Sequence, residues 1–548
     1  MESIVLVLVM LLAVVASGYL VRVLPFALPL PLAQIALGAL IAGAFNHGVA
    51  LDPEVFFLLF LPPLLFLDGW RIPKDGLFRD MRAILALALG LVLFTVVGAG
   101  LLIHWMIPAM PVAVAFALAA ILSPTDPVAV SSVAARVSIP KRLMHILEGE
   151  SLLNDASGLV CFRFAVAAAL TGGFSLAAAT LTFFWMALAG LALGLAVTLI
   201  VSWVQHALAR RFGEEGGSPI LISLLIPFGA YLLAERVHAS GILAAVAAGI
   251  TMSYAELRGR VLATTRVQRT AVWGMVQFAL NGIMFVLLGE QLPDMLRGAL
   301  DSVEQSGHVN PWWLAAYAVA ITVGLALLRL FWVWVAARRA LLRFHGHEAP
   351  RAPTPWRLLL ATTLAGVRGV ITLAGVLTLP QLLPDGTPLP ARDLAVFLAT
   401  CVILLSLLAA SFGLPRLLAD LPEPLESSAQ RQEDHARHAA AVAAIAAIEN
   451  AQRSLPQGAA DAELQTLAAA RVLALYRSRL GGGTDGETGA RELRRTEEFE
   501  RTLRLAGLQA EREAVFELTR RRRLADDTAR KLVREIDLID ARYRQETH

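Results

Sequence analysis

Apolar residues occur in long, nearly uninterrupted segments over the first three quarters of the chain. A helix needs about 20 such residues to cross the hydrocarbon core of a bilayer. Thirteen segments of this kind are present, at roughly 3–22, 29–46, 53–70, 82–107, 111–135, 143–171, 180–208, 218–237, 239–255, 270–292, 311–341, 355–381 and 392–418. Only RVHAS separates the eighth from the ninth, so that division could fall elsewhere. The pattern predicts an all-α polytopic membrane protein with about thirteen transmembrane helices.

The composition agrees with a membrane protein, because 57% of the residues are hydrophobic, against about 45–50% in soluble domains. The net charge of +3 is small for 548 residues, so it favours no particular partner, and we expect no nucleic-acid binding. Cys161 and Cys401 lie in different apolar segments, where we expect small core residues and not a disulfide. The first segment lacks the basic start and cleavage site of a signal peptide, which predicts a retained span.

Arginine and lysine are distributed unevenly between the two sets of alternating loops. The set that begins after the first segment holds nineteen of them, and the other set holds three, namely Arg236, Arg297 and Arg392. Basic residues concentrate in the cytoplasmic loops of membrane proteins. The asymmetry therefore predicts an outside N-terminus and, with an odd number of spans, a C-terminal tail in the cytoplasm.

Charged residues divide the chain near residue 421. Residues 421–548 carry 43 of the 91 Asp, Glu, Lys and Arg residues, which predicts a transmembrane domain at 1–420 followed by a helical tail. GGGTDGETGA at 481–490 indicates a flexible linker between two stretches rich in helix-forming residues. Their helices could pack on each other or on a partner subunit, or remain as solvated charged helices. The run Arg520–Arg523 is typical of a solvated face, although it could also touch anionic lipid.

Several ionisable and polar residues lie within the apolar segments, where placing them in the membrane costs free energy. A carboxylate at mid-bilayer costs about 2.5–3.5 kcal/mol on insertion scales, so it is rarely kept without a role. The residues concerned are Asp68, Asp126, Glu148, Glu150, Ser151, Asn154, Asp155, Arg163, Arg329 and Arg368. Asp68 and Glu148 lie nearer segment ends, where a structural and a functional role are equally open. We assign Arg163 no specific role beyond an ion pair or snorkelling toward the membrane surface.

The sixth segment presents two polar faces if it is helical. Ser151 and Asp155 are four residues apart and share one face, while Glu150 and Asn154 share a neighbouring face. Glu150 and Asp155 are separated by about 140° at about 100° per residue. We therefore expect Asp155 to face a cavity and Glu150 to face a buried arginine in a structural ion pair.

The fifth segment contains ILSPTDPVAV, in which two prolines flank a carboxylate. Pro124 and Pro127 lack a backbone N–H and interrupt the helical hydrogen-bond ladder. At membrane depth this is tolerated only where the backbone faces protein or a water-filled cavity. Free carbonyls together with Thr125 and Asp126 would form an oxygen cage suited to a small hard cation, as broken helices do in secondary transporters.

The twelfth segment predicts a second broken helix. It reads TTLAGVRGVITLAGVLTLP, with Gly366, Gly369 and Gly375 around Arg368. The fifth and twelfth segments are seven apart, so they would run in opposite directions, as an inverted repeat of segments 1–6 and 8–13 requires. Arg368 would then balance the negative helix ends and the acids near the crossing.

Five stretches together resemble the sodium/proton exchangers, a family of monovalent cation/proton antiporters. They are SPTDPVAV, GESLLNDASGLV, YLLAERVHASGILAAVAAGI, LNGIMFVLLG and GVRGVITLAG. The resemblance covers roughly residues 1–418, with the motifs in the family's order, and is greatest to bacterial members with a long cytoplasmic tail.

The resemblance implies a homodimeric transporter of the bacterial inner membrane, in contact with lipid, with a dimerisation part and a mobile core. It implies elevator-like exchange of Na⁺ for H⁺, with Li⁺ or K⁺ as open alternatives, and no cofactor beyond the transported ions. Asp155 would be the central ion and proton carrier, and Thr125, Asp126 and Ser151 would line the Na⁺ site.

The resemblance also assigns supporting residues. Asn154 would stabilise the crossing of the broken helices, and an asparagine before Asp155 is similar to the electroneutral members. Arg329 matches the family's partner for Glu150, and Arg368 matches the arginine of the glycine-rich twelfth span. Relatives place an acid near the end of the third span, which is Asp68 in this chain.

Other classes of function fit the sequence less well. Two intramembrane aspartates could form a protease dyad, but the Gly-x-Gly-Asp motif of those enzymes is absent, and the tail carries no catalytic or nucleotide-binding signature. A channel would need repeated filter loops, and none is visible. A carrier of organic solutes and a K⁺/H⁺ antiporter remain as alternatives, and we expect a transporter and not an enzyme.

Overall fold

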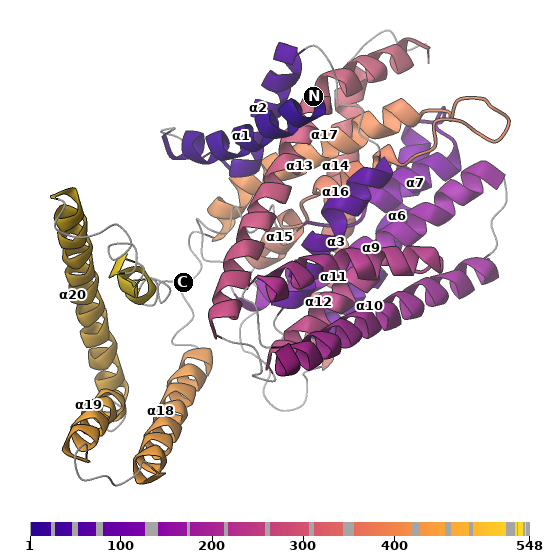
Figure 1. Cartoon of the computed structure of the whole chain (residues 1–548). Helices are drawn as coiled ribbons and strands as arrows, with labels where there is room; N and C mark the ends of the chain where they lie inside the picture. The colour runs from indigo at the N-terminus through magenta and orange to yellow at the C-terminus, as the bar shows by residue number, and fades with distance from the viewer. Residues whose placement is uncertain are drawn as a thin grey trace. The chain divides into compact units, whose positions relative to one another are not determined.

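The computed structural model describes residues 2–23, 28–45, 53–72, 80–126, 141–171, 176–212, 217–257, 263–305, 312–343, 356–418, 428–454, 462–481, 486–521, 532–533, 535–540 and 543. Helices account for nearly all regular structure in these ranges, and the β structure within them is an isolated bridge between Leu382 and Pro388 (Figure 1). The chain divides into two compact units, Met1–Leu421 and Pro422–His548.

The first unit contains the apolar helices. They are α1 (Glu2–Val23), α2 (Leu30–Phe45), α3 (Pro53–Arg71), α5 (Met81–Leu85), the π-helix η1 (Ala86–Leu91), α6 (Val92–Met106), α7 (Val112–Leu122), α9 (Lys141–Thr171), α10 (Leu176–Phe212), α11 (Ser218–Arg236), α12 (Gly241–Leu257), α13 (Ala263–Gln305), α14 (Trp312–Arg343), α15 (Trp356–Leu364), α16 (Val370–Leu377) and α17 (Arg392–Leu418).

Within the described residues, seven helices are long and apolar enough to cross a membrane, and four shorter ones are also apolar. This confirms the all-α polytopic fold, whereas the count of thirteen spans and the inverted repeat stay predictions. The eighth and ninth segments are separate helices, because α11 ends at Arg236 and α12 begins at Gly241. The chain turns between them at His238, whose φ of 54° lies in the left-handed region.

The helices of this unit form two packing groups. In the first, α7 packs on α6 and α9, and α14 packs on α6, α15 and α17. We call it the broken-helix group, because it contains both interrupted segments. In the second, α2 packs on α13, and α12 packs on α3, α10 and α11. We call this the glycine-packed group, and its helices approach each other backbone to backbone.

Glycines make this close approach possible. A Cβ atom added at Gly38 of α2 would lie 1.9 Å from the carbonyl oxygen of Val286 in α13, and one added at Gly289 would lie 1.9 Å from that of Ile35. Small residues at membrane helix interfaces allow such contacts and strengthen van der Waals packing. The glycine pattern therefore determines how closely α2 and α13 pack.

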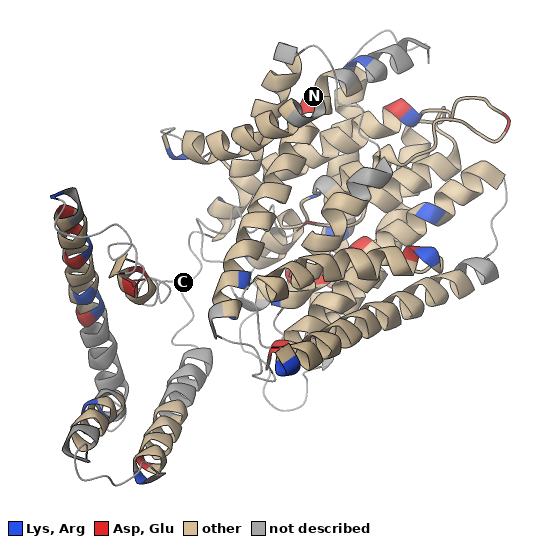
Figure 2. Cartoon of the chain, viewed as in Figure 1, with Lys and Arg blue, Asp and Glu red and all other residues tan. Residues whose placement is uncertain are grey.

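The described part of the tail is helical, with α18 (Ser428–Ser454), α19 (Ala462–Gly481) and α20 (Gly486–Arg520). Arg477 of α19 lies 3.6 Å from Glu449 of α18, and Arg512 of α20 pairs with Asp537 at 2.8 Å. Helices α18 and α19 thus pack on each other, and α20 pairs with the segment 535–540. Charged residues are denser on α20 than on the helices of the first unit (Figure 2).

The linker expected at 481–490 is shorter than the sequence suggested. Residue 481 ends α19, residues 486–490 begin α20, and 482–485 lie outside the described residues. Within the run Arg520–Arg523, residues 522–523 are also outside the described residues, and Arg521 binds Glu517 at 2.7 Å.

The glycine contacts generate a prediction about stability. Substituting Gly38→Ala should destabilise the protein by about 1–3 kcal/mol, because the new methyl group would collide with a backbone carbonyl that cannot rotate away. The matched control is Gly43→Ala on the same helix, where nothing lies within 4 Å of the added atom. Melting temperatures of both variants in detergent would be compared with the wild type, and equal melting of the two would contradict the packing argument.

Candidate functional site

The two interrupted helices meet at their breaks. Residues 124–126 after α7 are not helical, and neither are residues 365–369 between α15 and α16. The backbone N–H of Asp126 donates a hydrogen bond to the carbonyl oxygen of Val367 at 2.8 Å. A Cβ atom at Gly369 would lie 1.9 Å from Oδ2 of Asp126, so only glycine leaves room for this carboxylate. The second break predicted from the sequence is therefore present, whereas Pro127 lies outside the described residues.

Arg368 binds the ends of the broken helices. Its Nε donates to the carbonyl oxygen of Leu122 at 2.9 Å, its guanidinium also donates to the carbonyl of Gly366, and its backbone N–H donates to Oγ of Ser406 at 3.1 Å. The side chain is buried. The last carbonyls of a helix lack intrahelical partners and carry partial negative charge. Arg368 therefore satisfies carbonyls that the two breaks expose.

Glu150 and Arg329 form the expected ion pair inside the broken-helix group. Nη2 of Arg329 lies 2.8 Å from Oε2 of Glu150, and a second contact joins Nη1 to Oε1. Arg329 also donates from Nε to the carbonyl oxygen of Thr362 at 3.1 Å. The two residues are 1% and 2% exposed, so this pair is a buried structural element.

A chain of polar contacts connects the ion pair to the break after α7. Nδ2 of Asn154 donates to Oγ1 of Thr125 at 3.0 Å, and Oγ1 of Thr125 lies 3.5 Å from Oε1 of Glu150. All three residues are buried. The Thr125 hydroxyl is therefore engaged with protein partners, and the polar face formed by Glu150 and Asn154 points into the broken-helix group.

The other face of α9 carries Asp155 and Ser151, which are 4% and 5% exposed. Leu152 and Ala156 on this side pack in one cluster with residues of α3 and α12. The face thus looks toward the glycine-packed group. The two polar faces of α9 are separate, with one serving the ion pair and the other directed at the boundary between the two groups.

Three carboxylates converge at this boundary. Asp155 lies on the face of α9 that packs against α3, Asp126 follows α7, which packs on α9, and Asp68 shares the face of α3 that meets α9. The three carboxylates interact electrostatically, and Glu148 adds to the negative charge near Asp68. Asp126 and Asp68 are half-buried, whereas Asp155 is buried. Grouped negative charges in a low-dielectric environment are unfavourable unless a proton or a cation neutralises them. The arrangement is therefore chemically suited to bind either one.

The π-helix η1 was not anticipated from the sequence. Oγ of Ser157 in α9 donates to the carbonyl oxygen of Ala88 at 2.5 Å, and Oγ of Ser123 donates to that of Val92 at 3.3 Å. Single π-turns inside helices are frequent at functional sites. Both hydroxyls come from residues beside the carboxylate site, so they tie its backbone to the neighbouring helix.

Two further ion pairs were missed or left undecided by sequence reasoning. Arg269 was assigned to a loop, yet it is 1% exposed within α13 and pairs with Glu256 of α12. The sequence did contain a signal for this pair: Glu256 and Arg269 have opposite charges and lie at the two ends of the short segment between the ninth and tenth apolar runs. Arg163 is half-exposed and lies 3.2 Å from Glu235 of α11, which resolves its role as an ion pair.

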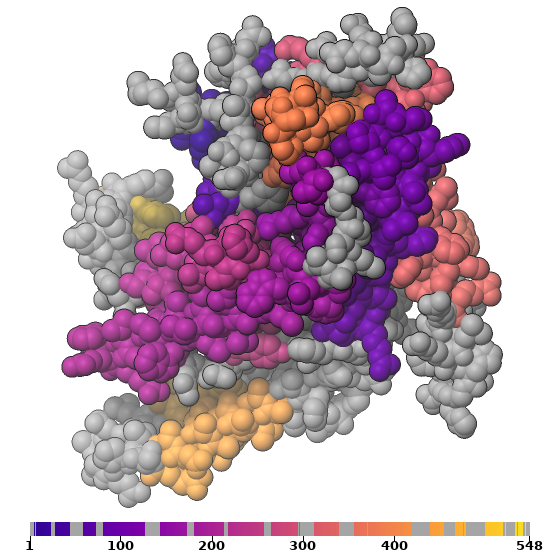
Figure 3. All heavy atoms as spheres, turned by 90° about the vertical axis from the view of Figure 1, so that its right-hand side faces the viewer, coloured from indigo at the N-terminus to yellow at the C-terminus, as the bar shows by residue number. Residues whose placement is uncertain are grey.

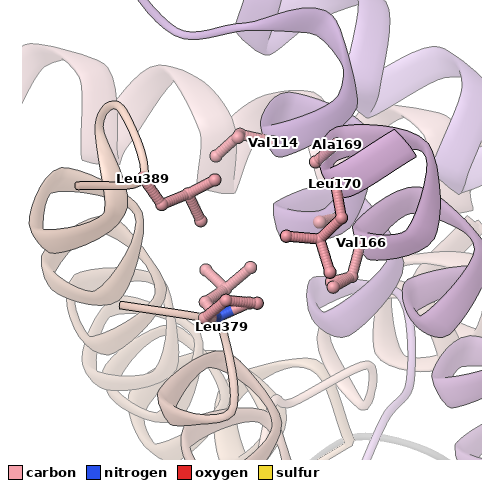
Figure 4. Close-up of a pocket in the computed structure, with 8 residues that line it drawn as sticks. Val114, Val166, Ala169, Leu170, Leu379 and Leu389 are labelled. Atoms are coloured by element: carbon pink, nitrogen blue, oxygen red, sulfur yellow. The ribbon is translucent and has the colours of Figure 1, made fainter. Parts of the chain in front are cut away.

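A described pocket between α7, α9 and the residues that follow α16 is separate from the carboxylate site. It has a volume of about 190 Å³ and is lined by apolar side chains that include Val114, Val166, Leu170, Leu379 and Leu389 (Figure 4). Residues 378–391, drawn in orange, lie beside α7 on the face shown in Figure 3. The lining of this pocket is apolar and offers no oxygen ligand to a cation.

Comparisons with known proteins agree with this geometry. The family described as sodium/hydrogen exchanger, transmembrane, matches residues 7–420. The chain is 42% identical to the uncharacterized Na(+)/H(+) exchanger YjcE of Escherichia coli, over 99% of both chains. It is 43% identical to the sodium, potassium, lithium and rubidium/H(+) antiporter of Bacillus pumilus, over 76% of this chain and 61% of that protein.

A solved structure shows the same fold. The sodium proton antiporter MjNhaP1 from Methanocaldococcus jannaschii aligns with 77% of this chain and 99% of its own, at a TM-score of 0.57 and 18% identity. The fold and site define a secondary transporter of the multi-pass membrane class. The chain belongs to the sodium/hydrogen exchanger family of cation/proton antiporters.

The buried ion pair generates a second prediction. Glu150→Gln and Arg329→Ala should each lower stability by about 3–5 kcal/mol, because either change leaves an uncompensated buried charge. Melting in detergent would report the loss. Arg163→Gln, which breaks the exposed pair with Glu235, should cost only about 0–1 kcal/mol. Wild-type melting of both core variants would refute a structural role for the pair.

Proposed function

We propose that this protein exchanges Na⁺ for H⁺, and that the convergence of Asp155, Asp126 and Asp68 at the helix crossing is the observation that carries the proposal. Li⁺ and K⁺ are proposed as further substrates, since the Bacillus pumilus relative is named for sodium, potassium, lithium and rubidium. A K⁺/H⁺ antiporter is the alternative. Na⁺ is the cargo of this site, and we propose no resident cofactor.

Asp155 is the proposed carrier of the cation and the proton. It is buried on the face of α9 that looks toward the glycine-packed group, and Ser151 adds a hydroxyl oxygen one turn away. Asp126 supplies a second carboxylate from the break. Because the Thr125 hydroxyl is engaged with Asn154 and lies near Glu150, its contribution as a ligand comes from its backbone carbonyl.

The supporting residues keep the site in shape without binding the ion. Asn154 holds Thr125, the pair of Glu150 with Arg329 closes the inner face of α9, and Arg368 binds the exposed carbonyls of the broken helices. Glu148 and Asp68 add negative charge beside the carrier, which attracts cations toward it. Removal of any of these groups would alter the site indirectly.

The proposed transport cycle is elevator-like alternating access. Asp126 and Asp155 belong to the broken-helix group, whereas Asp68 belongs to the glycine-packed group, so movement of one group against the other carries the site. The glycine-packed group contains the backbone contacts of α2 with α13 and is suited to remain fixed and to form the homodimer. Alternation of this kind is typical of transporters with discontinuous helices.

Charge balance supports electroneutral exchange. Asp155 is preceded by Asn154 and not by a second aspartate, so one carboxylate exchanges one Na⁺ for one H⁺. Orientation follows from the loop arginines and lysines, with the N-terminus outside and the tail in the cytoplasm of a bacterial inner membrane. We assign the tail, residues 421–548, a regulatory role.

The first test of this function is Asp155→Asn. The amide is nearly isosteric but can neither lose a proton nor neutralise a cation, so exchange should be abolished while insertion and oligomeric state are unchanged. Na⁺-driven proton movement in proteoliposomes is the measurement, with Asp385→Asn on an exposed loop as the matched control. Substantial exchange by Asp155→Asn would exclude Asp155 as the carrier.

A shared binding site also predicts competition between Na⁺ and H⁺. The apparent affinity for Na⁺ should weaken as pH falls, because protons occupy the carboxylate, and coordination requires its deprotonated form. The rate should be bell-shaped, slow at low pH for want of empty sites and slow at high pH for want of protons. The measurement is exchange at several pH values with Na⁺, Li⁺ and K⁺ in turn.

The same proteoliposomes test two claims separately: that Na⁺ and H⁺ share one binding site, and that the exchange is electroneutral. A Na⁺ affinity that does not change with pH would overturn the shared site. Voltage set by potassium and valinomycin, in experiments with Na⁺ or Li⁺, should leave the rate unchanged. A rate that follows the voltage would reject electroneutral exchange and leave antiport itself intact.

A further inference from the structure

A buried cluster outside the ion site holds the C-terminal end of α3. The indole N–H of Trp70 donates to Oε2 of Glu256 in α12 at 2.8 Å, and Arg269 of α13 pairs with the other oxygen, Oε1. Arg269 is 1% exposed. Both carboxylate oxygens of Glu256 are thus occupied, and the carboxylate that receives Trp70 is itself held by a buried cation.

Aromatic stacking fixes the same turn from a second side. Phe66 stacks on Trp273 of α13 with ring centroids 5.2 Å apart, and Trp70 lies 6.4 Å from the same ring. The indole N–H of Trp273 donates to Oγ of Ser223 in α11 at 3.2 Å. The last turn of α3 is therefore connected to three helices of the glycine-packed group.

The α3 backbone requires such external support. Pro62 and Pro63 lie inside the helix and remove two N–H donors from its ladder, which weakens the connection between its two halves. Gly69 and Gly249 then let α3 and α12 approach closely, since a Cβ atom at Gly249 would lie 2.0 Å from the carbonyl oxygen of Phe66. The position of the last turn is set by its side contacts more than by the helix itself.

Asp68 lies on this turn, two residues before Trp70. Two residues correspond to about 200° around a helix, so the side chains point to nearly opposite sides. Trp70 is bound to α12 and packs near α13. Asp68 shares the opposite face with Leu61 and Leu65, and these two leucines pack in one cluster with Leu152 and Ala156 of α9, beside Asp155. Anchoring the indole therefore sets the direction of the Asp68 carboxylate.

We propose that Trp70, Glu256 and Arg269 are positioning residues for transport: together they hold the end of α3 so that Asp68 faces the carboxylates of the broken-helix group. The proposal rests on cation/proton exchange at that site. The three residues do not touch the ion. They keep the charge contributed by the glycine-packed group at a fixed place while the opposing carboxylates bind and release their cargo.

The test uses Trp70→Phe, which removes the indole N–H but keeps an aromatic ring beside Trp273 and changes no charge. Full-length protein in proteoliposomes should show an apparent KM for Na⁺ raised about tenfold at an unchanged maximal rate, by analogy with groups that orient metal ligands. The matched control is Trp185→Phe. It removes an indole N–H bond to Val237 on an exposed surface and should leave both parameters unchanged.

A double-variant cycle separates positioning from general packing. In an Asp68→Asn background, Trp70→Phe should cause no further rise in KM, because its effect passes through the Asp68 carboxylate. A tenfold rise that persists in this background, or a lower maximal rate at unchanged KM, would overturn the proposal. Na⁺-dependent shifts in melting temperature measure binding without transport. The Na⁺ concentration that gives half of the maximal shift should be higher for Trp70→Phe than for the wild type.

Exchange by the wild-type protein tests the proposed function separately from the positioning proposal. If wild-type vesicles show no cation-driven proton movement, the exchange assignment fails, and the positioning proposal falls with it. If the wild type exchanges and Trp70→Phe behaves like Trp185→Phe, only the positioning proposal is rejected.

Discussion

A charge inside a membrane must be compensated within the protein, and this constraint organises the broken-helix group. Glu150 and Arg329 neutralise each other, and Arg368 is satisfied by the carbonyls of Leu122 and Gly366. With these charges balanced inside the protein, Asp126 and Asp155 are the two acids that the proposed exchange of a cation for a proton would use.

The helix breaks and the glycines serve this arrangement in complementary ways. The breaks expose backbone groups at membrane depth, and these groups are satisfied across the crossing, as by the bond from Asp126 to Val367. Gly369 leaves room for the Asp126 carboxylate, and Gly158 leaves room for Pro124. In the other group, glycines bring α2 and α13 into backbone contact. One group is thus built around the satisfaction of polar groups and the other around close backbone packing.

Much of the candidate site could be predicted from local patterns. Two prolines around Asp126 predicted the break, and helical spacing separated Glu150 from Asp155 before any contact was known. Arg368 was recognised as a buried cation among glycines in the second break. The arginine that pairs with Glu150 was assigned by resemblance to a family. The residues around Arg329 do not indicate its partner, because Glu150 lies 179 residues away in the sequence.

The sequence by itself determined the helical membrane class, the interrupted segments and the identity of the costly polar residues, because hydrophobic length, proline chemistry and helical period are local properties. Only the tertiary structure decided which of these groups meet. Trp70 contacts Glu256 and Ser157 contacts Ala88, and such pairs depend on how distant helices are positioned and rotated against each other. Burial of Arg269 was unforeseen for the same reason: a charge next to a loop becomes part of the core only when a neighbouring helix supplies its counter-charge.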